Sequence, residues 1–474
     1  MASNKRVHSF TDDVLSDLDG VALAALIKKK EVTAEEVVAA SIARSKKMDP
    51  TLNAIVTEHY DTGMAAAKTP KDGFFAGIPT FFKDLTLFEG QKTYYGTEAI
   101  TNPKPSKKTD PIAKQILAQG FINLGTSSMP EFGFACSTEF PTTQATPNPW
   151  NPGYSAGGSS GGAAALVAAG VVPIAHSADG GGSTRIPASC CGLVGLKATR
   201  GRLLPSNLFA AQVVEIAIDG VITRTVRDTA HFYDEAEKYY KNPKLKPMGL
   251  VSGPSNRKYK IGFTSDSVKG RTSDAANKEV VKQTAALLQA MGHQVKEMTL
   301  PTKDQFSDDF VNLWGMSAFY VRHFGKLMFG SNFDGKKMTK MSHGLAKHHL
   351  RNIWKTPFFI NRLKKSYFDY QKLLADLDID IILTPTLAHT APELGYLGMN
   401  LEFEEMFPRM ADWACFSPYA NATGAPSISL PLGHDMVNDL PIGMMFGANH
   451  GEEALLLDLA FQLEEAQPWR KITA

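Results

Sequence analysis

The chain has 474 residues, of which 43% are hydrophobic, and its 50 Lys and Arg against 48 Asp and Glu give a formal net charge of +2. This composition is sufficient for a sizeable core, and the small net charge excludes a global field of the kind that draws proteins to nucleic acid. The four cysteines form neither a disulfide framework nor a zinc-binding pattern, so we expect reduced, buried thiols and no metal site.

The N-terminal segment, MASNKRVHSFTDD, lacks a long apolar stretch and therefore does not resemble a secretory signal. No uninterrupted apolar run of about 18 residues occurs, so we expect no membrane-spanning helix and no membrane partner. A cytoplasmic location is the default expectation.

Residues 18–47 predict two helices, and the second begins with a capping box in which Glu36 follows Thr33 by three positions. A short strand-like run lies at 53–56. Residues 111–120 predict another helix, which a strand and a loop follow.

Residues 77–87 mix turn and apolar residues and predict a central strand that carries Lys83. A lysine inside an apolar run is unusual, because burial of an ammonium group is costly and lowers its pKa. A neutral buried lysine can serve as a general base. A lone lysine of this kind more often lies at a strand end and reaches solvent, so this interpretation depends on whether a candidate nucleophile occurs later in the chain.

The stretch from Gly157 to Gly192 reads GGSSGGAAALVAAGVVPIAHSADGGGSTRIPASCCG. It places Ser159 and Ser183, 24 residues apart, each within a cluster of glycines, and the small residues between them suit a close-packed helix. Glycine-rich backbone can expose its N–H groups and let a substrate approach closely. A serine in such a loop can attack a carbonyl carbon, with the neighbouring N–H groups as an oxyanion hole.

Other interpretations of this stretch are weaker. Gly157-x-Ser159-x-Gly161 satisfies the nucleophile-elbow pattern of α/β-hydrolases, but an elbow needs a strand directly before it and Asn-Pro-Gly-Tyr at 151–154 is a poor strand. A phosphate-binding loop is not favoured, since Ala163 stands where that pattern requires lysine. His176 precedes Ser183 by seven residues, and one histidine near a serine is weak support for a triad.

Three motifs in this order resemble the amidase signature family of serine hydrolases. They are GIPTFFKD at 77–84, GGSSGG at 157–162 and DGGGSTRIPASCCGLVGLKAT at 179–199. The resemblance implies a Ser–cisSer–Lys triad, with Ser183 as the nucleophile, Ser159 as the bridging serine on a cis peptide and Lys83 as the base. It also implies an oxyanion hole formed by Gly180, Gly181, Gly182 and Ser183.

By the same resemblance, Cys136, Ser137 and Thr138 line the substrate cleft, although an ordinary surface loop explains that segment equally well. Gly180 departs from the family pattern, which usually has Thr or an Ile-like residue there. Arg185 stands where the family also has Arg. Its charged hydrogen bonds could hold the nucleophile loop or could pair at a surface, and we favour the structural role.

The length alone suggests roughly three domains, on a prior of about 150 residues each. The resemblance covers nearly the whole chain and implies instead a single large α/β domain, with a central twisted mixed β-sheet covered by helices on both faces. Within this amidase signature domain, 1–474, we expect a family-like core at about 70–230 and 376–466 and a divergent, substrate-side region at about 240–375. Residues 321–370 hold eleven Lys or Arg against two acids, which a solvated helical face explains and which an entrance surface for an aromatic or polymeric substrate would also explain.

The function that the resemblance implies is hydrolysis of the C–N bond of a small-molecule amide through a Ser183 acyl-enzyme, without a cofactor. Esters and carbamates, urethanes included, pass through a similar tetrahedral oxyanion. The overall pattern is most similar to bacterial hydrolases of linear or cyclic amides, of the 6-aminohexanoate type, and to urethanases. Two alternatives stay open, an amidotransferase subunit of a tRNA-dependent complex and a G-x-S-x-G α/β-hydrolase. We expect a monomer or a homodimer.

Overall fold

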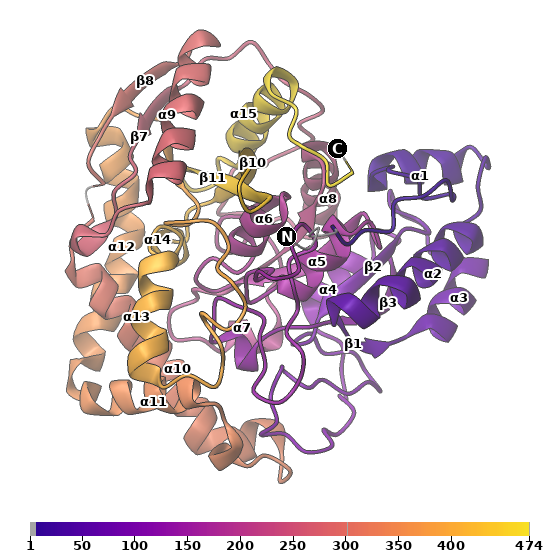
Figure 1. Ribbon diagram of the computed structural model, residues 1–474, viewed down its shortest axis with the longest axis horizontal. Coiled ribbons are helices and arrows are strands. Elements are labelled where there is room, and N and C mark those ends of the chain that lie inside the picture. The colour runs from indigo at the N-terminus through magenta and orange to yellow at the C-terminus, as the bar shows by residue number, and fades with distance from the viewer. Residues whose placement is uncertain (1–5, 301, 474) are drawn as a thin grey trace.

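Two β-sheets organise the chain, with helices packed around them (Figure 1). The computed structural model describes residues 6–300 and 302–473. The larger sheet has eight strands in the order β4-β6-β5-β10-β11-β9-β7-β8, and the smaller has the order β1-β3-β2. Neighbouring strands of the larger sheet are antiparallel from β4 to β9 and parallel across β9-β7-β8, which confirms a mixed sheet in an α/β fold.

The strands of the larger sheet come from both halves of the chain. They are β4 (Ile174–Asp179), β5 (Val194–Lys197), β6 (Ile218–Thr223), β7 (Lys260–Phe263), β8 (Gln294–Glu297), β9 (Ile381–Pro385), β10 (Ser427–Asp435) and β11 (Leu440–Ala448).

Helices cover both faces of this sheet, as expected. Side chains of successive strand residues point to opposite faces. Ile174 joins the core that contains residues of α8 (Val226–Tyr239), α9 (Ala275–Ala290) and α15 (Glu453–Ala466). Its neighbour Ala175 joins the core that contains residues of α5 (Gly161–Ala168) and α6 (Arg185–Cys191). These two short helices are almost wholly buried because small residues form most of them, and each begins next to one of the glycine clusters.

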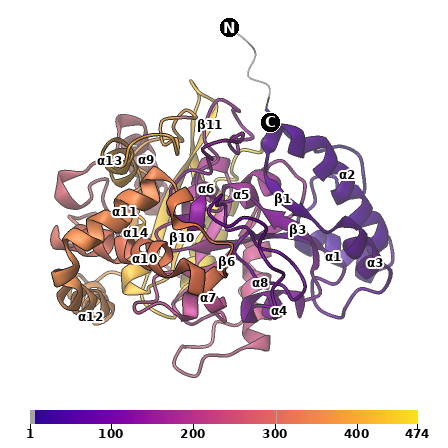
Figure 2. The same cartoon turned by 90° about the horizontal axis from the view of Figure 1, so that it is seen from below.

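The smaller sheet and the first helices form one side of the molecule in both views (Figures 1 and 2). Its strands are β1 (Ile55–Glu58), β2 (Pro79–Lys83) and β3 (Ile122–Ser127), and the helices are α1 (Gly20–Lys28), α2 (Ala34–Leu52), α3 (Tyr60–Lys68) and α4 (Pro111–Leu117). The capping box is confirmed, since the Glu36 N–H donates to Thr33 Oγ1 at 3.2 Å and the Thr33 N–H donates to the Glu36 carboxylate at 2.8 Å.

The prediction that Lys83 lies on a central strand is wrong, because β2 is an edge strand of the smaller sheet. It pairs in parallel with β3 and meets β4 through side chains. Thr80 Oγ1 donates to the Ile174 carbonyl at 2.9 Å, and the Lys83 N–H donates to His176 Nδ1 at 3.2 Å. The His176 imidazole therefore accepts a backbone N–H that could otherwise have bonded to a neighbouring strand. The two sheets are in contact here but remain separate sheets.

The opposite side of the molecule holds the long helices between residues 305 and 376 (Figures 1 and 2). They are α10 (Gln305–Phe329), α11 (Lys340–Arg351) and α12 (Thr356–Asp376), with α13 (Phe403–Trp413) beside α11 and α14 (Pro418–Thr423) beside α12. The short helix α7 (Asn207–Ala210) lies between β5 and β6 in the sequence. Within the described ranges, none of these helices combines the length and apolar character that crossing a membrane requires.

The capping box allows a test of local stability. Thr33→Ala removes the hydroxyl that accepts the Glu36 N–H and should lower the free energy of unfolding by about 1 kcal/mol. Urea denaturation followed by circular dichroism measures the change. Thr51→Ala on the same helix is the control, because its exposed hydroxyl makes no hydrogen bond among the described residues. Equal unfolding midpoints for the two variants would show that the capping box does not stabilise the protein.

Candidate active site

Lys83 ends strand β2 and is 1% exposed. Its Nζ donates to Ser159 Oγ at 2.6 Å and to the Ala178 carbonyl at 3.3 Å. Burial lowers the pKa of Lys83 to about 7, and the charges of Asp179 and Asp219 partly oppose that effect. A substantial fraction of this amine is therefore neutral near pH 7, which is the state in which a lysine can accept a proton.

Ser159 lies in the glycine loop that precedes α5, after a cis peptide bond between Gly158 and Ser159, which confirms the expected geometry. The loop packs closely against the segment that contains Cys136, since a Cβ at position 158 would lie 2.7 Å from the Cys136 carbonyl carbon. Only glycine suits this position without displacement of the neighbouring backbone. The close approach places the Ser159 hydroxyl against the Lys83 amine.

Ser183 lies in the second glycine loop, between β4 and α6, and is 7% exposed. The Asp179 carboxylate shapes this loop, because it accepts the N–H groups of Gly182 at 2.7 Å and Thr184 at 3.1 Å. Ser183 and Ser159 line the same cavity, and no hydrogen bond joins their hydroxyl groups in the part of the chain that the structure describes.

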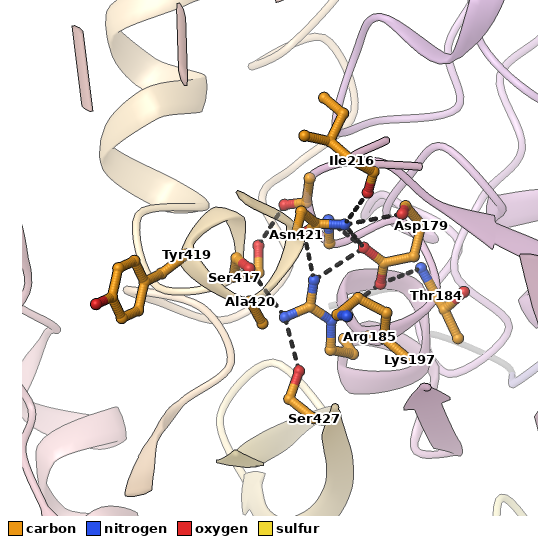
Figure 3. Close-up of polar contacts among 12 residues, drawn as sticks. Asp179, Thr184, Arg185, Lys197, Ile216, Ser417, Tyr419, Ala420, Asn421 and Ser427 are labelled. Carbon is orange, nitrogen blue, oxygen red and sulfur yellow. Dashed lines mark hydrogen bonds and ion pairs between the residues drawn. The ribbon is translucent and has the colours of Figure 1, made fainter. Parts of the chain in front are cut away.

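Arg185 supports the same loop through Asp179, and its side chain is fully buried (Figure 3). Its guanidinium donates to both carboxylate oxygens of Asp179, at 2.8 and 2.9 Å. It also donates to four groups from the C-terminal part of the chain, the Ser417 carbonyl, Ser427 Oγ, Asn421 Oδ1 and Met445 Sδ. Burial alone would raise the pKa of Asp179, but the charge and hydrogen bonds of Arg185 hold it below its usual range. The structural role expected for Arg185 is thus confirmed.

Three backbone donors of the Ser183 loop are available to a ligand. Among the described residues, the N–H groups of Gly180, Gly181 and Ser183 donate to no acceptor. Gly182 differs from the expectation, because its N–H already donates to Asp179 Oδ1 and cannot at the same time contribute to an oxyanion hole. Such a cluster of unpaired backbone donors can stabilise a negative oxygen that develops next to Ser183.

A cavity of about 420 Å³ opens in front of these groups, and Lys83, Ser159 and Ser183 all line it. Of the three residues expected to line the cleft, Cys136 does so, and burial raises the pKa of its thiol to about 12. Ser137 and Thr138 do not. Ser137 Oγ donates to Glu139 Oε1, and Thr138 Oγ1 donates to the Gly157 carbonyl and accepts the Gly161 N–H. These two fully buried side chains support the glycine loop from outside the cavity.

Neither rival arrangement of a nucleophile occurs. Residues 151–158 contain no strand leading into Ser159, and β4 follows the loop and α5 rather than preceding them, so the nucleophile-elbow interpretation is wrong. His176 faces the Lys83 backbone and Asp219 rather than either serine. Within the described ranges, no three His, Cys, Asp or Glu side chains are grouped so as to hold a metal ion.

Sequence reasoning missed two residues of this site. Asp179 directly precedes the glycines of the Ser183 loop, so its place in the motif was a usable signal. Asn421 was not detectable from the local sequence, because it lies 242 residues away from Asp179. Its Nδ2 donates to both the backbone and the side chain of Asp179, at 2.8 Å each, and to the Ile216 carbonyl at 2.9 Å (Figure 3).

Comparisons with known proteins find amidases that are similar to this chain in sequence and fold. A protein-family model described as amidase matches residues 36–457. "Putative amidase AmiC" of Mycobacterium tuberculosis is 42% identical over 472 residues, which cover 99% of this chain and 98% of that protein. The 6-aminohexanoate-cyclic-dimer hydrolase of Paenarthrobacter ureafaciens is 30% identical over 482 residues, with 95% of each chain covered. A solved structure of 6-aminohexanoate cyclic dimer hydrolase complexed with substrate is similar with a TM-score of 0.83 and 27% identity, over 96% of this chain and 98% of that chain.

The buried ion pair behind the Ser183 loop can be tested directly. Asp179→Asn leaves the Arg185 guanidinium without a counter-charge and should lower the free energy of unfolding by about 3–5 kcal/mol. Chemical denaturation measures the loss, with Asp72→Asn, a change at an exposed carboxylate, as the control. Wild-type stability of Asp179→Asn would show that the pair does not hold the loop.

Proposed function

The chain belongs to the amidase family, and we propose that Ser183 forms the acyl-enzyme through which it hydrolyses amide bonds. The observation that carries this proposal is the 2.6 Å hydrogen bond from Lys83 Nζ to Ser159 Oγ at the wall of the cavity that Ser183 also lines. A base and a hydroxyl at this distance can exchange a proton. The second hydroxyl in the same cavity has three unpaired backbone donors beside it.

In the proposed reaction, neutral Lys83 accepts the proton of Ser159, which in turn accepts the proton of Ser183. Ser183 Oγ attacks the carbonyl carbon, and the N–H groups of Gly180, Gly181 and Ser183 stabilise the oxyanion. Hydrogen bonds of catalytic groups often tighten only when substrate is bound, so we expect the Ser159–Ser183 contact to shorten in the complex. The proton then returns through Ser159 to the leaving nitrogen, and water attacks the acyl-enzyme to release the acid.

The same steps apply to esters and to carbamates, because each forms a tetrahedral oxyanion and then expels a leaving group. We propose small linear or cyclic amides as substrates, with esters and urethanes as further ones. The similarity to 6-aminohexanoate-cyclic-dimer hydrolase over 95% of both chains supports amides of that general kind. The tRNA-dependent amidotransferase alternative has less support, since the relative that is 42% identical over 99% of this chain is described as an amidase.

The nucleophile is tested by substitution and by labelling. Ser183→Ala should reduce the rate by several orders of magnitude, as expected when a covalent nucleophile is lost. A fluorophosphonate should add once to the wild type, and peptide mass mapping should place the adduct on Ser183. Ser189→Ala, a change on α6 outside the cavity, is the control and should still be labelled. An adduct on Ser159, with Ser183→Ala still active, would contradict the proposal.

The base is tested by a pH–rate profile on a matched amide and ester. Lys83 must be neutral to act, and its pKa is lowered to about 7, so the rate should rise with pH through about 7 and stay high in the alkaline range. Lys83→Ala should cost more on the amide than on the ester, because the poorer leaving group needs the returned proton more. Lys83→Arg should not restore activity, since arginine stays charged.

Lys71→Ala, which changes an exposed lysine, is the control for that experiment and should keep the wild-type profile. An active Lys83→Ala enzyme with an unchanged profile would place the base elsewhere.

A further inference from the structure

The cavity in front of Ser183 has walls of aromatic and aliphatic side chains. Among the described residues that line it, none is Asp, Glu or His, and the two cations are Lys83 and Arg271. The Arg271 charge is already paired, because its Nε donates to Asp412 Oδ1 at 2.6 Å. A ligand group in this cavity therefore meets no carboxylate that could balance a positive charge.

The apolar wall begins directly at the Ser183 loop. A Cβ at Gly181 would lie 3.4 Å from Phe310 Cζ, so the Phe310 ring packs against the backbone that carries the unpaired donors. Trp314 follows one turn later on α10 and also lines the cavity, as do Phe306 and Phe324 on the same helix. A group attached to the reacting carbonyl would therefore lie among aromatic rings.

We propose that the substrates of this site are uncharged amides with an extended apolar acyl group, and that the site rejects an acyl group that ends in an ammonium ion. This inference rests on the proposed function. Burial of apolar surface against the rings favours binding, whereas transfer of an unpaired ammonium into the same space is strongly unfavourable. Of the amides considered above, uncharged cyclic ones should be hydrolysed in preference to linear oligomers that end in an amine.

Two 4-nitroanilides of equal length test the proposal. Heptanoyl-4-nitroanilide ends in a methyl group where 6-aminohexanoyl-4-nitroanilide ends in an ammonium ion, which is charged at an assay pH of 8. The kcat/KM of the heptanoyl compound should be at least about 100-fold higher, because removal of an ammonium from water is not compensated in this cavity. Equal values would overturn the proposal, as would cleavage of acetyl-4-nitroanilide in strong preference to the heptanoyl compound.

A negative charge introduced into the cavity wall should reduce the preference for the heptanoyl over the 6-aminohexanoyl substrate. Gln212 lines the cavity, and its Oε1 accepts the N–H groups of Ile216 and Ala217, both at 3.2 Å. Gln212→Glu keeps both acceptor contacts and adds a negative charge, so it should raise the relative kcat/KM of the ammonium substrate by about 10-fold. Gln289→Glu, an exposed site on α9, adds the same charge away from the cavity and should leave the ratio unchanged.

Labelling of Ser183 by a fluorophosphonate distinguishes a failure of the proposed function from a failure of the substrate assignment. An enzyme that is not labelled there lacks the proposed nucleophile, and the proposed function fails. An enzyme that is labelled at Ser183 but cleaves neither long anilide, or that gives the same ratio before and after Gln212→Glu, contradicts the substrate assignment alone.

A buried histidine lies behind Lys83 and supports a second, independent inference. His176 on β4 is fully buried, and its Nδ1 accepts the Lys83 N–H at 3.2 Å. A ring nitrogen that accepts a hydrogen bond carries no proton, so the neutral ring has its proton on Nε2. His176 Nε2 lies 3.1 Å from Asp219 Oδ1 and donates to it, and Asp219 Oδ2 accepts the Ser206 N–H at 3.0 Å.

We infer that His176 and Asp219 are positioning residues for Lys83. The imidazole fixes the Lys83 backbone, and the carboxylate favours the ammonium form of its side chain. The titratable groups near Lys83 are Asp179 and His176 on β4, Asp219 on β6, Asp84 next in the chain and Cys136 in the same cavity. The charge of Asp179 is balanced by Arg185, at 2.8 Å. Asp219 contacts no Lys or Arg among the described residues, and its charge acts with the larger effect of Asp179 to raise the pKa of Lys83, against the effect of burial.

The rate of fluorophosphonate labelling at Ser183 as a function of pH tests this inference without a substrate. Asp219→Asn removes the charge that favours the ammonium form of Lys83, so the acid limb of the profile should move to lower pH by about one pH unit. Thr80→Val is the control, because it removes a different buried β2–β4 hydrogen bond and leaves the charges near Lys83 intact. The acid limb of the Thr80→Val labelling profile should stay at the wild-type pH, even if the substitution lowers stability.

Two substitutions of the histidine provide a test that does not depend on the folding of Asp219→Asn. Asn can place a carbonyl oxygen near the position of His176 Nδ1, whereas Leu leaves the Lys83 N–H buried without an acceptor. Labelling of His176→Asn should therefore be at least about 10-fold faster than that of His176→Leu. An unmoved acid limb in Asp219→Asn, or equal rates for the two His176 variants, would overturn this inference, whereas absence of labelling in the wild type would instead count against the proposed function.

Discussion

The buried Asp179–Arg185 ion pair is the interaction on which the candidate site depends. Transfer of two charges from water is costly, and their attraction compensates only when the remaining hydrogen-bonding positions are filled. Here they are filled by groups from separate parts of the fold: the N–H groups of Gly182 and Thr184, the amide of Asn421 and the Ser417 carbonyl. The pair therefore joins the end of β4 to α14 and β10, and it fixes the Ser183 backbone before any substrate arrives. Donors that are already oriented stabilise a developing charge without reorganisation.

The three candidate catalytic side chains come from two sheets and the loop between them. Lys83 ends an edge strand of the smaller sheet, Ser183 follows a strand of the larger sheet, and Ser159 lies in the glycine loop that packs where the sheets meet. The sheets approach closely because His176 and Thr80 satisfy backbone groups that would otherwise need a ladder partner. The geometry of the site is thus a consequence of how the sheets are joined. A substitution at that junction can alter the position of Lys83 although the substituted residue does not line the cavity.

Local features of the fold could be predicted from the sequence, because they depend on neighbouring residues. The capping box at Thr33 and the helices and strands near it are of this kind, and so are the two glycine loops, whose motifs carried the family resemblance. The position of β2 could not be predicted, since an apolar run does not reveal its partner strand. The same limit explains why the roles expected for Ser137, Thr138 and Gly182 differ from what the structure shows. Their polar groups bind partners inside the fold and are not free for a ligand. Which acceptor an N–H or hydroxyl finds is decided by tertiary packing, and a motif does not specify that acceptor.

Burial of a lysine is not by itself a sign of a base, and this chain contains the counterexample. Lys197 ends β5 as Lys83 ends β2, and both side chains are 1% exposed. Burial lowers the pKa of Lys197 well below its usual value, and the nearby charge of Arg185 lowers it further. Its Nζ, however, donates to the Ala198 carbonyl, and in the described part of the chain Lys197 is not among the residues that line the cavity. What distinguishes Lys83 is the hydroxyl at 2.6 Å and the access of that hydroxyl to the cavity. A lowered pKa makes a lysine available as a base, and the partner that the fold supplies determines whether it can act as one.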